Sequence, residues 1–474
     1  METMHLPRLP FETYKHVESV YISAMDRINA QALVRFGLGA SQADKPDADP
    51  RGALRAQLQG PDPGLASGAF DGLPTGLDAM DAQRADDLSR KAFLAAGKPA
   101  GAKPVYQRKA LYQADLDAQI GWAVRTTASF RERLVWFYAN HFSVSVLQGN
   151  TFALVGPMIR EAIRPHVNGN FTDMVLAAER HPAMLRYLDN EASVGPDSDM
   201  GIRTGKGLNE NLGRECMELH TVGLAAGYTQ TDVTNMAKIL TGWSVAPAAG
   251  GGDATGFKYR PAAHEPGPQT VLGYSFDGGE QAGIDALTFL SRHPSAYRLL
   301  AAKLVTHFVA DNPPEADIAR IAAVLTDTGG DLLAAANTLV DLQAAWQPMT
   351  KLKTPQEFLV STLRAAPAED GQPIDYAGIS GQLGQAFWAA PLPNGWPDQA
   401  ASWDGSDAIL SRVDWAYTYA GRFNDNTGGP QPADIAQTAL GGLLRPATAQ
   451  AIDTAGSRRE ALTLLFAAPE FQRR

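Results

Sequence analysis

The sequence predicts a mainly α-helical protein, a multi-helical single globular unit with long loops rich in Gly and Pro and at most a small β-hairpin. Apolar residues recur at helical spacing through most of the chain, and the segments between them are rich in Gly, Pro and Asp. Alternating runs typical of strands are few. With 474 residues, 45% of them hydrophobic, the chain is long enough to bury a sizeable core.

Charge and cysteine content argue against several classes of function. The chain has 41 Lys and Arg against 51 Asp and Glu, a formal net charge of −10, so we expect no nucleic-acid partner. Cys216 is the only cysteine, which excludes a disulfide within the chain and a zinc site built from paired thiolates. We find no phosphate-binding glycine loop, dinucleotide fingerprint or nucleophile elbow, and therefore no motif for a nucleotide cofactor.

The sequence shows neither a membrane span nor an export signal. No stretch approaches the roughly 18 consecutive apolar residues that a membrane helix needs. The first residues scatter Arg8, Glu12 and Lys15 where a secretory signal has an apolar centre, which favours a cytoplasmic location.

We expect one helical globular domain, 1–474, in four parts. N-terminal helices and a Pro/Gly-rich loop occupy 30–115, a central helical core with the site candidates 116–245, a loop with a hairpin 246–278, and C-terminal helices 279–474. The hairpin is expected to pair Phe257–Tyr259 with Thr270–Phe276 around the turn-forming stretch PAAHEPGP.

The first segment that could carry chemistry is RERLVWFYANHFSVS. Its apolar positions and His141 recur at i, i+3, i+4, i+7 and i+8, so His141 lies on the inward stripe of a helix. A buried imidazole needs a partner for each ring nitrogen. A structural core histidine and a catalytic or metal-binding histidine are both compatible with this position.

The second segment is NENLGRECMELHTVG, in which Asn211, Glu215 and Glu218 form a polar stripe beside an apolar one. At i+4 spacing, Arg214 is expected to pair with Glu218, and Asn211 with Glu215. This stripe is either a charged surface or a cleft lining. In a cleft, Glu215 and Glu218 would divide acid and base roles, because two close carboxylates cannot both ionise cheaply.

Two further histidines could join these groups. His220 follows Glu218 by two residues and Glu215 by five, which on an α-helix places it well round from both. This spacing matches neither H-E-x-x-H nor E-x-x-H, so a metal site would need His141 or His264 from elsewhere. His264 lies in a loop between Gly and Pro residues, where function is more common than packing.

The segment GYTQTDVTNMAKILTGW predicts a helix with a defined start and end. Thr229 is a plausible N-cap with Asp232 three residues on, and Gly242 is a natural helix stop. Trp243 beyond it is either a packed core residue or a stacking platform for a substrate.

A short repeated sequence and two further segments also contain candidate residues. ERHPAMLRYL and SRHPSAYRLL share R-H-P, which predicts a helix with Pro182 or Pro294 in its first turn. Lys351 and Lys353 precede a helix that begins with Pro, and by default such lysines are solvated. Trp396 and Trp403, in a turn-rich stretch, are packed by default.

These segments resemble the recurring blocks of a bacterial family known as domain of unknown function 1800. The resemblance rests on RERLVWFYANHF, IRPHVNGNFTDMVLAAERHPAMLRYLDN, NENLGRECMELHTVG and GYTQTDVTNMAKILTGW, with weaker echoes to about Arg412 and RFGLGAS near Arg35. It implies a bacterial helical protein of one unit and does not imply an activity. Family members often begin with an export signal, so an extracytoplasmic location stays open beside the cytoplasmic one.

Three functions remain as hypotheses. The first is a hydrolase-type or transferase-type enzyme acting on a small or polymeric polar substrate. The second is a His/carboxylate metalloprotein holding a divalent metal. The third is a non-catalytic binding or assembly protein whose polar residues form an internal network. For the enzyme, the catalytic candidates are His141, Glu215, Glu218, His220 and His264, and the substrate-binding candidates are Asn209, Asn211, Arg214 and Trp243.

Overall fold

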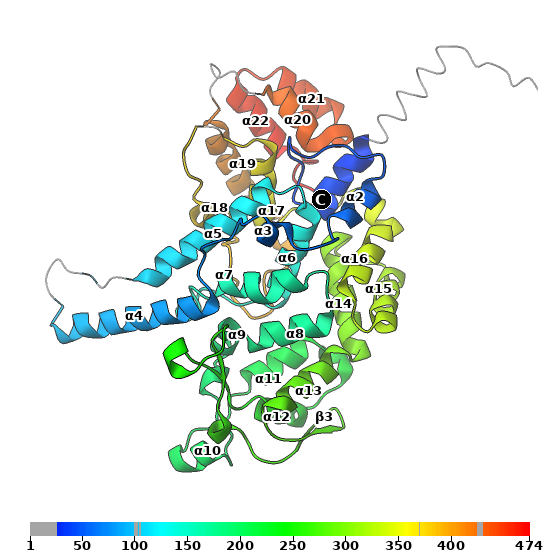
Figure 1. Ribbon diagram of the computed structural model, residues 1–474. Helices are drawn as coiled ribbons and strands as arrows, with labels where there is room; N and C mark the ends of the chain where they lie inside the picture. The colour runs from blue at the N-terminus through cyan, green and yellow to red at the C-terminus, as the bar shows by residue number, and fades with distance from the viewer. Residues whose placement is uncertain (1–25, 99–102, 104–105, 369, 424–429) are drawn as a thin grey trace, which may run out of the picture.

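The computed structural model of the protein describes residues 26–98, 103, 106–368, 370–423 and 430–474. The first residues, on which the expectation about an export signal rests, lie outside these ranges. Helices make up most of the described chain and pack into a single globular unit, which confirms the predicted fold class (Figure 1).

The first half of the chain contains short and long helices, and the pair formed by α4 and α5 projects from the body (Figure 1). Its helices are α2 (Pro50–Ala56), α3 (Pro63–Ala66), α4 (Gly76–Ala95), α5 (Gln107–Arg125), α6 (Ser129–His141), α7 (Val155–Met158), α8 (Phe171–Arg180), α9 (Pro182–Tyr187), α10 (Asp199–Thr204), α11 (Asn211–Glu215) and α12 (Gln230–Ile239). Among the described residues of this half, three segments are π-helical: Ala32–Phe36, Ile159–Ile163 and Cys216–His220.

The second half is more regular. Its helices are α13 (Glu280–Ser291), α14 (Pro294–Phe308), α15 (Glu315–Thr328), α16 (Leu332–Asp341), α17 (Pro355–Ala365), α18 (Tyr376–Gln382), α19 (Ser406–Ala420), α20 (Pro432–Leu440), α21 (Pro446–Asp453) and α22 (Arg458–Ala467). Helices α19 to α22 gather at one end of the molecule, and α8 to α13 at the other (Figure 1).

The predicted segments 257–259 and 270–276 do form strands, but they pair differently from the prediction, and one strand, β1 (Trp243–Val245), was not predicted. β2 (Phe257–Tyr259) pairs with β1 (Trp243–Val245), and β3 (Gln269–Val271) pairs with β4 (Tyr274–Phe276), both antiparallel. The predicted pairing of the 257 segment with the 270 segment is therefore wrong. A residue with positive φ, Leu272, is followed by Gly273, so the chain reverses within the second segment itself.

The buried hydrophobic residues of the described chain form two cores, which divide in sequence mainly between Ala345 and Phe358. The larger core draws on residues from Ala32 to Ala345, and the smaller one on Leu38, α5 and residues from Phe358 to Phe471. Helices α6 and α17 lie near the middle of the molecule, beside the C-terminus (Figure 1).

Helix α6 is buried along most of its length although it carries three charged residues. Arg131, Glu132 and Arg133 are each only 2% exposed. Glu132 accepts two hydrogen bonds of 2.7 Å from Arg164, one on each carboxylate oxygen. Arg131 forms an ion pair with Asp62 at 3.4 Å. Buried charges need such partners, so α6 ties several distant segments together.

Helix starts follow the predicted capping chemistry. The Thr229 side chain and Asp232 form a capping box at α12, as predicted. In both R-H-P segments the histidine is the N-cap: Nδ1 of His181 and of His293 accepts the backbone N–H two residues on, and the proline occupies the first helical position. The echo is thus a repeated helix start.

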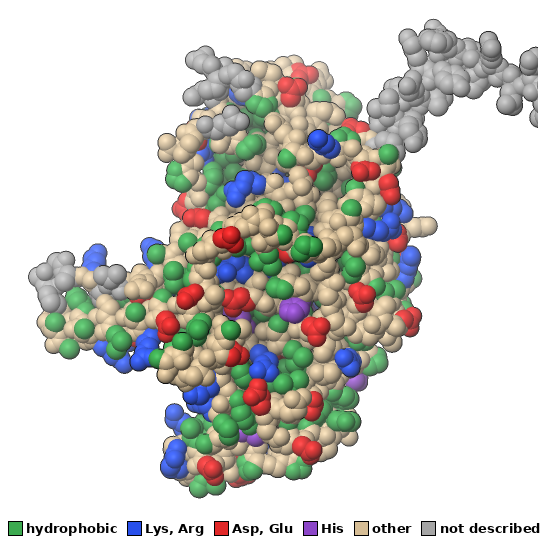
Figure 2. Space-filling model, in the orientation of Figure 1, with side chains coloured by type: hydrophobic (Ala, Val, Ile, Leu, Met, Phe, Trp, Pro, Cys, Tyr) green, Lys and Arg blue, Asp and Glu red, His purple; other side chains and the backbone are tan. Residues whose placement is uncertain are grey.

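No helix in the described ranges combines the length and apolar character that a bilayer crossing requires. On the face shown in Figure 2, Lys and Arg side chains are interspersed with Asp and Glu. That face carries no continuous patch of one charge.

Candidate functional site

His141 lies where the sequence predicts, on the buried face of α6. Its Nε2 is 3.1 Å from the backbone oxygen of His220, and its Nδ1 is 3.1 Å from Nζ of Lys303. A carbonyl only accepts, so Nε2 carries the proton and Nδ1 accepts from the ammonium group. Burial lowers the pKa of His141 well below its usual value, and the positive charge of Lys303 lowers it further. His141 is therefore a neutral residue whose two nitrogens are both used.

Lys303 is a site residue that the sequence analysis missed. Its ammonium group donates to His141 and, at 2.9 Å, to the backbone oxygen of Leu219. Burial lowers the pKa of Lys303 to about 8, although Asp398 opposes the shift. Lys303 shares α14 with Arg298 and His307, and no motif distinguishes it from them.

His220 forms a close pair with a second missed residue, Glu179. Its Nδ1 lies 2.6 Å from Oε1 of Glu179, and neither side chain is more than 1% exposed. The carboxylate accepts, so Nδ1 carries a proton, and Nε2 is the ring nitrogen that this contact leaves unused. Nε2 is buried and has no hydrogen-bond partner among the described residues. This arrangement, a basic nitrogen oriented by a carboxylate on the other nitrogen, is the one that general bases use.

The π-helical segment Cys216–His220 explains why the spacing argument misplaced His220. A π-helix bonds residues i and i+5, so one turn contains an extra residue. Residues five apart then lie nearly over one another, whereas on an α-helix they diverge by about 140°. Glu215 and His220 are thereby brought within electrostatic reach of each other.

Glu215 and Glu218 are both half-buried, so they are neither fully exposed on a charged surface nor fully enclosed in a cleft. Burial raises the pKa of Glu215, and nearby Glu218 and Glu179 raise it further, whereas His220 and Arg214 lower it. Glu218 accepts a hydrogen bond of 3.3 Å from the hydroxyl of Tyr228. Glu215 is thus within electrostatic reach of both His220 and Glu179, and it is partly exposed.

The expected pairs along α11 do not form. Arg214 forms its ion pair with Glu210 at 3.1 Å, not with Glu218. Asn211 is exposed, and its backbone N–H donates to Oδ1 of Asn209 at 2.9 Å. The change of helical register after Glu215 removes the i+4 relation on which the Arg214–Glu218 pairing was based.

Two predicted residues lie apart from this group. His264 belongs to the loop after β2, where Nδ1 donates to the backbone oxygen of Thr241 at 2.9 Å and Nε2 accepts from the N–H of Gly279 at 2.7 Å. Trp243 is fully buried and packs edge to face on Phe257. A Cβ on Gly283 would lie 2.4 Å from its ring. His264 holds a loop, and Trp243 is a core residue.

The described residues offer no group of side chains suited to binding a metal ion. Over the ranges that the structure describes, no three His, Cys, Asp or Glu side chains are grouped so that they could hold a metal ion. Among the site histidines, only His220 has a ring nitrogen without a partner in the described chain, Nε2. Its other ring nitrogen contacts one carboxylate, that of Glu179.

A second buried polar network lies at the meeting point of the two cores. Glu357 forms ion pairs with Arg133 at 2.6 Å and with Arg474 at 2.7 Å. His307 donates from Nδ1 to Asp398 at 2.7 Å and accepts from Nε of Arg133 at 3.2 Å.

Two lysines expected in solvent belong to this region. Lys351, paired with Asp311, and Lys353, which donates to Ser361 at 3.0 Å, are buried. The prediction that Lys351 and Lys353 are exposed to solvent is therefore wrong. A buried network such as this one fits the third hypothesis, a scaffold specified by polar contacts.

Comparison with known proteins gives a family and no activity. The chain matches the model of the family described as "Protein of unknown function (DUF1800)" over residues 31–473. Neither the curated proteins nor the solved structures contain a match to it. Because the family model covers nearly the whole chain, the protein belongs to the DUF1800 family.

Proposed function

We propose that the protein is an enzyme of the hydrolase or transferase type that uses acid–base chemistry at His220 and Glu215. The observation that carries the proposal is the free Nε2 of His220, a buried basic nitrogen whose ring is held by Glu179 at 2.6 Å. Other buried side-chain atoms of the described residues also lack a partner, but Nε2 of His220 is the only imidazole nitrogen among them, and a catalytic role is one reason for a protein to keep such an atom unsatisfied.

The proposed roles follow from the surroundings of each group. Nε2 of His220 takes a proton from the attacking hydroxyl group or water, and Glu179 is a positioning residue that holds the imidazole in the required tautomer. Glu215, whose pKa is raised by burial, is the general acid that protonates the leaving group. A polar substrate approaches over Glu215 and Glu218, which are partly exposed, and reaches Nε2 after a side-chain displacement.

One observation favours a structural reading. Both nitrogens of His141 are already occupied, and this residue ties α6 to Lys303 and to the backbone of His220. We therefore leave His141 and His264 out of the catalytic group. If His220 were only a further member of an internal network, the protein would be a binding or assembly protein.

The test is a screen of chromogenic esters, phosphate esters and glycosides with the wild-type protein and three variants. Hydrolysis of the accepted class should fall by roughly 100-fold or more in His220→Gln and in Glu215→Gln. Glu315→Gln, an exposed carboxylate paired with Arg298, is the matched control and should keep full activity. Thermal melting checks that each variant is folded. Activity that survives in folded His220→Gln and Glu215→Gln would mean that the acid–base assignment is wrong.

A further inference from the structure

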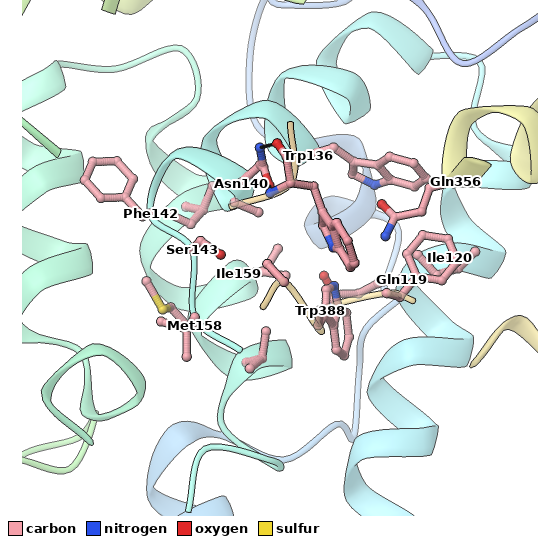
Figure 3. A pocket seen from close by; sticks show the side chains of 17 residues that line it. Gln119, Ile120, Trp136, Asn140, Phe142, Ser143, Met158, Ile159, Gln356 and Trp388 are labelled. Atoms are coloured by element: carbon pink, nitrogen blue, oxygen red, sulfur yellow. Dashed lines mark hydrogen bonds between the residues drawn. The ribbon is translucent and has the colours of Figure 1, made fainter. Parts of the chain in front are cut away.

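Two hollows of the described chain differ in size and in lining. The space beside the end of α6 measures about 70 Å³ and is bordered mainly by apolar side chains, among them Trp136, Ile159 and Trp388 (Figure 3). It is smaller than the ~150 Å³ cavity that one benzene molecule occupies, so it has no room for a ring-sized ligand. The groove between the β3–β4 hairpin and α13 measures about 810 Å³, within the range of ~300–1,000 Å³ that is usual for ligand sites.

The side chains that α13 and its C-cap residue contribute to this groove recur every three or four residues, so they share one face of the helix. They are Gln281, Asp285, Thr288, Phe289 and Arg292. Nε2 of Gln281 donates to Oδ1 of Asp285 at 2.9 Å, and the exposed guanidinium of Arg292 has no hydrogen-bond partner among the described residues. One wall of the groove is therefore mainly polar.

The β3–β4 hairpin holds an aromatic ring against this wall. Tyr274 packs on Phe289 with ring centroids 5.3 Å apart and planes 20° apart, and the ring centroid of Phe276 lies 5.0 Å from that of Tyr274. Tyr274 is nevertheless 56% exposed, so the ring face turned away from Phe289 is open. The N–H of Leu272 donates to Asp232 at 2.8 Å and ties the hairpin to α12. The ring is therefore in place before a ligand arrives.

Groups that donate and groups that accept hydrogen bonds also line the groove. Nδ1 of His293 accepts from the N–H of Ser295 at 3.2 Å, so the ring proton is on Nε2, which has no partner in the described chain. The carboxylate of Asp277 is exposed and likewise has no partner there. With Asp285 and Arg292, the groove carries charges of both signs, so it provides no strong field of one sign for a polyanion or a polycation.

We propose that this groove binds neutral sugar units of a polysaccharide, with one sugar ring stacked on Tyr274. A pyranose ring has an apolar face of C–H groups, which packs on an aromatic ring, and hydroxyl groups around its edge, each of which both donates and accepts hydrogen bonds. The open face of Tyr274, with carboxylate acceptors and guanidinium and imidazole donors around it, complements both parts of such a ring. None of His220, Glu215 and Glu179 lines the groove, so the inference does not rest on the proposed catalysis.

Affinity electrophoresis of the full chain, in gels that contain galactomannan, xyloglucan, mixed-linkage β-glucan or dextran, tests the proposal. At least one of these neutral polysaccharides should slow the protein, whereas the polyanion heparin should not. Tyr274→Ala should weaken binding about tenfold because the sugar loses its stacking surface, and Tyr274→Phe, which keeps the ring, should stay within about twofold of the wild type. Asp277→Ala removes an acceptor from the same groove and should weaken binding about threefold.

Two control variants should bind like the wild type. Tyr417→Ala removes a tyrosine of similar exposure, 50%, on α19 at the opposite end of the molecule (Figure 1). Glu215→Gln changes the proposed catalytic group and not the groove, so its binding is independent of the outcome of the substrate screen. Thermal melting confirms that each variant is folded. The proposal is overturned if none of the four neutral polysaccharides binds, if heparin binds more tightly than they do, or if Tyr274→Ala binds like the wild type.

Discussion

At the scale of single residues, the buried histidines differ in how completely their rings are bonded. His141 and His307 each use one nitrogen as donor and one as acceptor, with partners between 2.7 and 3.2 Å. The ring of His220 is held on one side only. Burial lowers the pKa of His307 to about 4, despite the opposing charge of Asp398, so it stays neutral at physiological pH. The rings bonded at both nitrogens stabilise the fold, whereas the free nitrogen of His220 is the one that the proposed catalysis would use.

Lys353 gives a prediction about pH. Burial lowers its pKa from 10.5 to about 7, although Glu357 opposes the shift. Between these values the unfolded chain binds the proton and the folded chain does not, so the free energy of unfolding rises as pH increases from 7 to 10.5. This contribution, up to ~1.4 kcal/mol per pH unit, should be absent in Lys353→Met. Urea unfolding at pH 7, 8.5 and 10 measures it.

The control for this experiment is Lys206→Met, which changes an exposed lysine. It should keep the wild-type pH dependence. Parallel pH profiles for the wild type and Lys353→Met would show that the buried amine stays protonated throughout.

The site residues could be predicted from the sequence only in part. The apolar stripe around His141 placed that residue correctly in the core. Glu179 and Lys303 were missed because neither belongs to a motif, and each shares its helix with other charged residues. Their importance arises from contacts between segments 41 and 162 residues apart, which no local pattern contains.

At the scale of secondary-structure elements, the type of helix decides which side chains share a face, even where the position of the helix is predicted correctly. The sequence places a helix over Asn211–His220, as observed, but side-chain spacing was read with α-helical geometry. The π-helical turn after Glu215 changes which residues share a face. Apolar periodicity does not distinguish a π-helix from an α-helix, so the relation between His220 and Glu215 is visible only in three dimensions.

The R-H-P helix starts can be tested at α14. Nδ1 of His293 accepts from the N–H of Ser295 at 3.2 Å, and Pro294 follows it in the first helical position. His293→Ala should lower the free energy of unfolding by about 1 kcal/mol, because that N–H loses its partner. His293→Asn, which keeps a side-chain acceptor, should restore most of the loss. Equal stability of the two variants in urea unfolding would show that the ring contributes by packing and not as a cap.

At the scale of the whole molecule, the fold class follows from composition and periodicity, whereas the joint between the two cores does not. Apolar periodicity predicts the helices because each one buries a face, whatever its partner. The joint consists of charged residues on α6, α14 and α17, in the loop at Asp398 and at Arg474. Each charged residue, taken alone in the sequence, is predicted to be exposed to solvent. They are buried only because they pair with one another in the folded structure.

Arg474 tests the strength of this joint. It is 2% exposed, and it contacts Glu357, Asp398 and the backbone oxygen of His307. Arg474→Met should lower the free energy of unfolding at pH 7 by about 3 kcal/mol, because two buried carboxylates lose a partner. Arg473→Met, at the exposed neighbouring position, is the control and should change stability little.

The pH dependence of the same variant separates charge from packing. Burial would raise the pKa of Glu357, but Arg133 and Arg474 outweigh it and lower the pKa from 4.5 to about 2. The stabilisation from this shift is full above pH 4.5 and is lost as pH falls through 2. The difference between the wild type and Arg474→Met in urea unfolding should therefore shrink from pH 7 to pH 3. A difference that stays constant over this range would mean that Arg474 joins the two cores through its packed side chain and not through its charge.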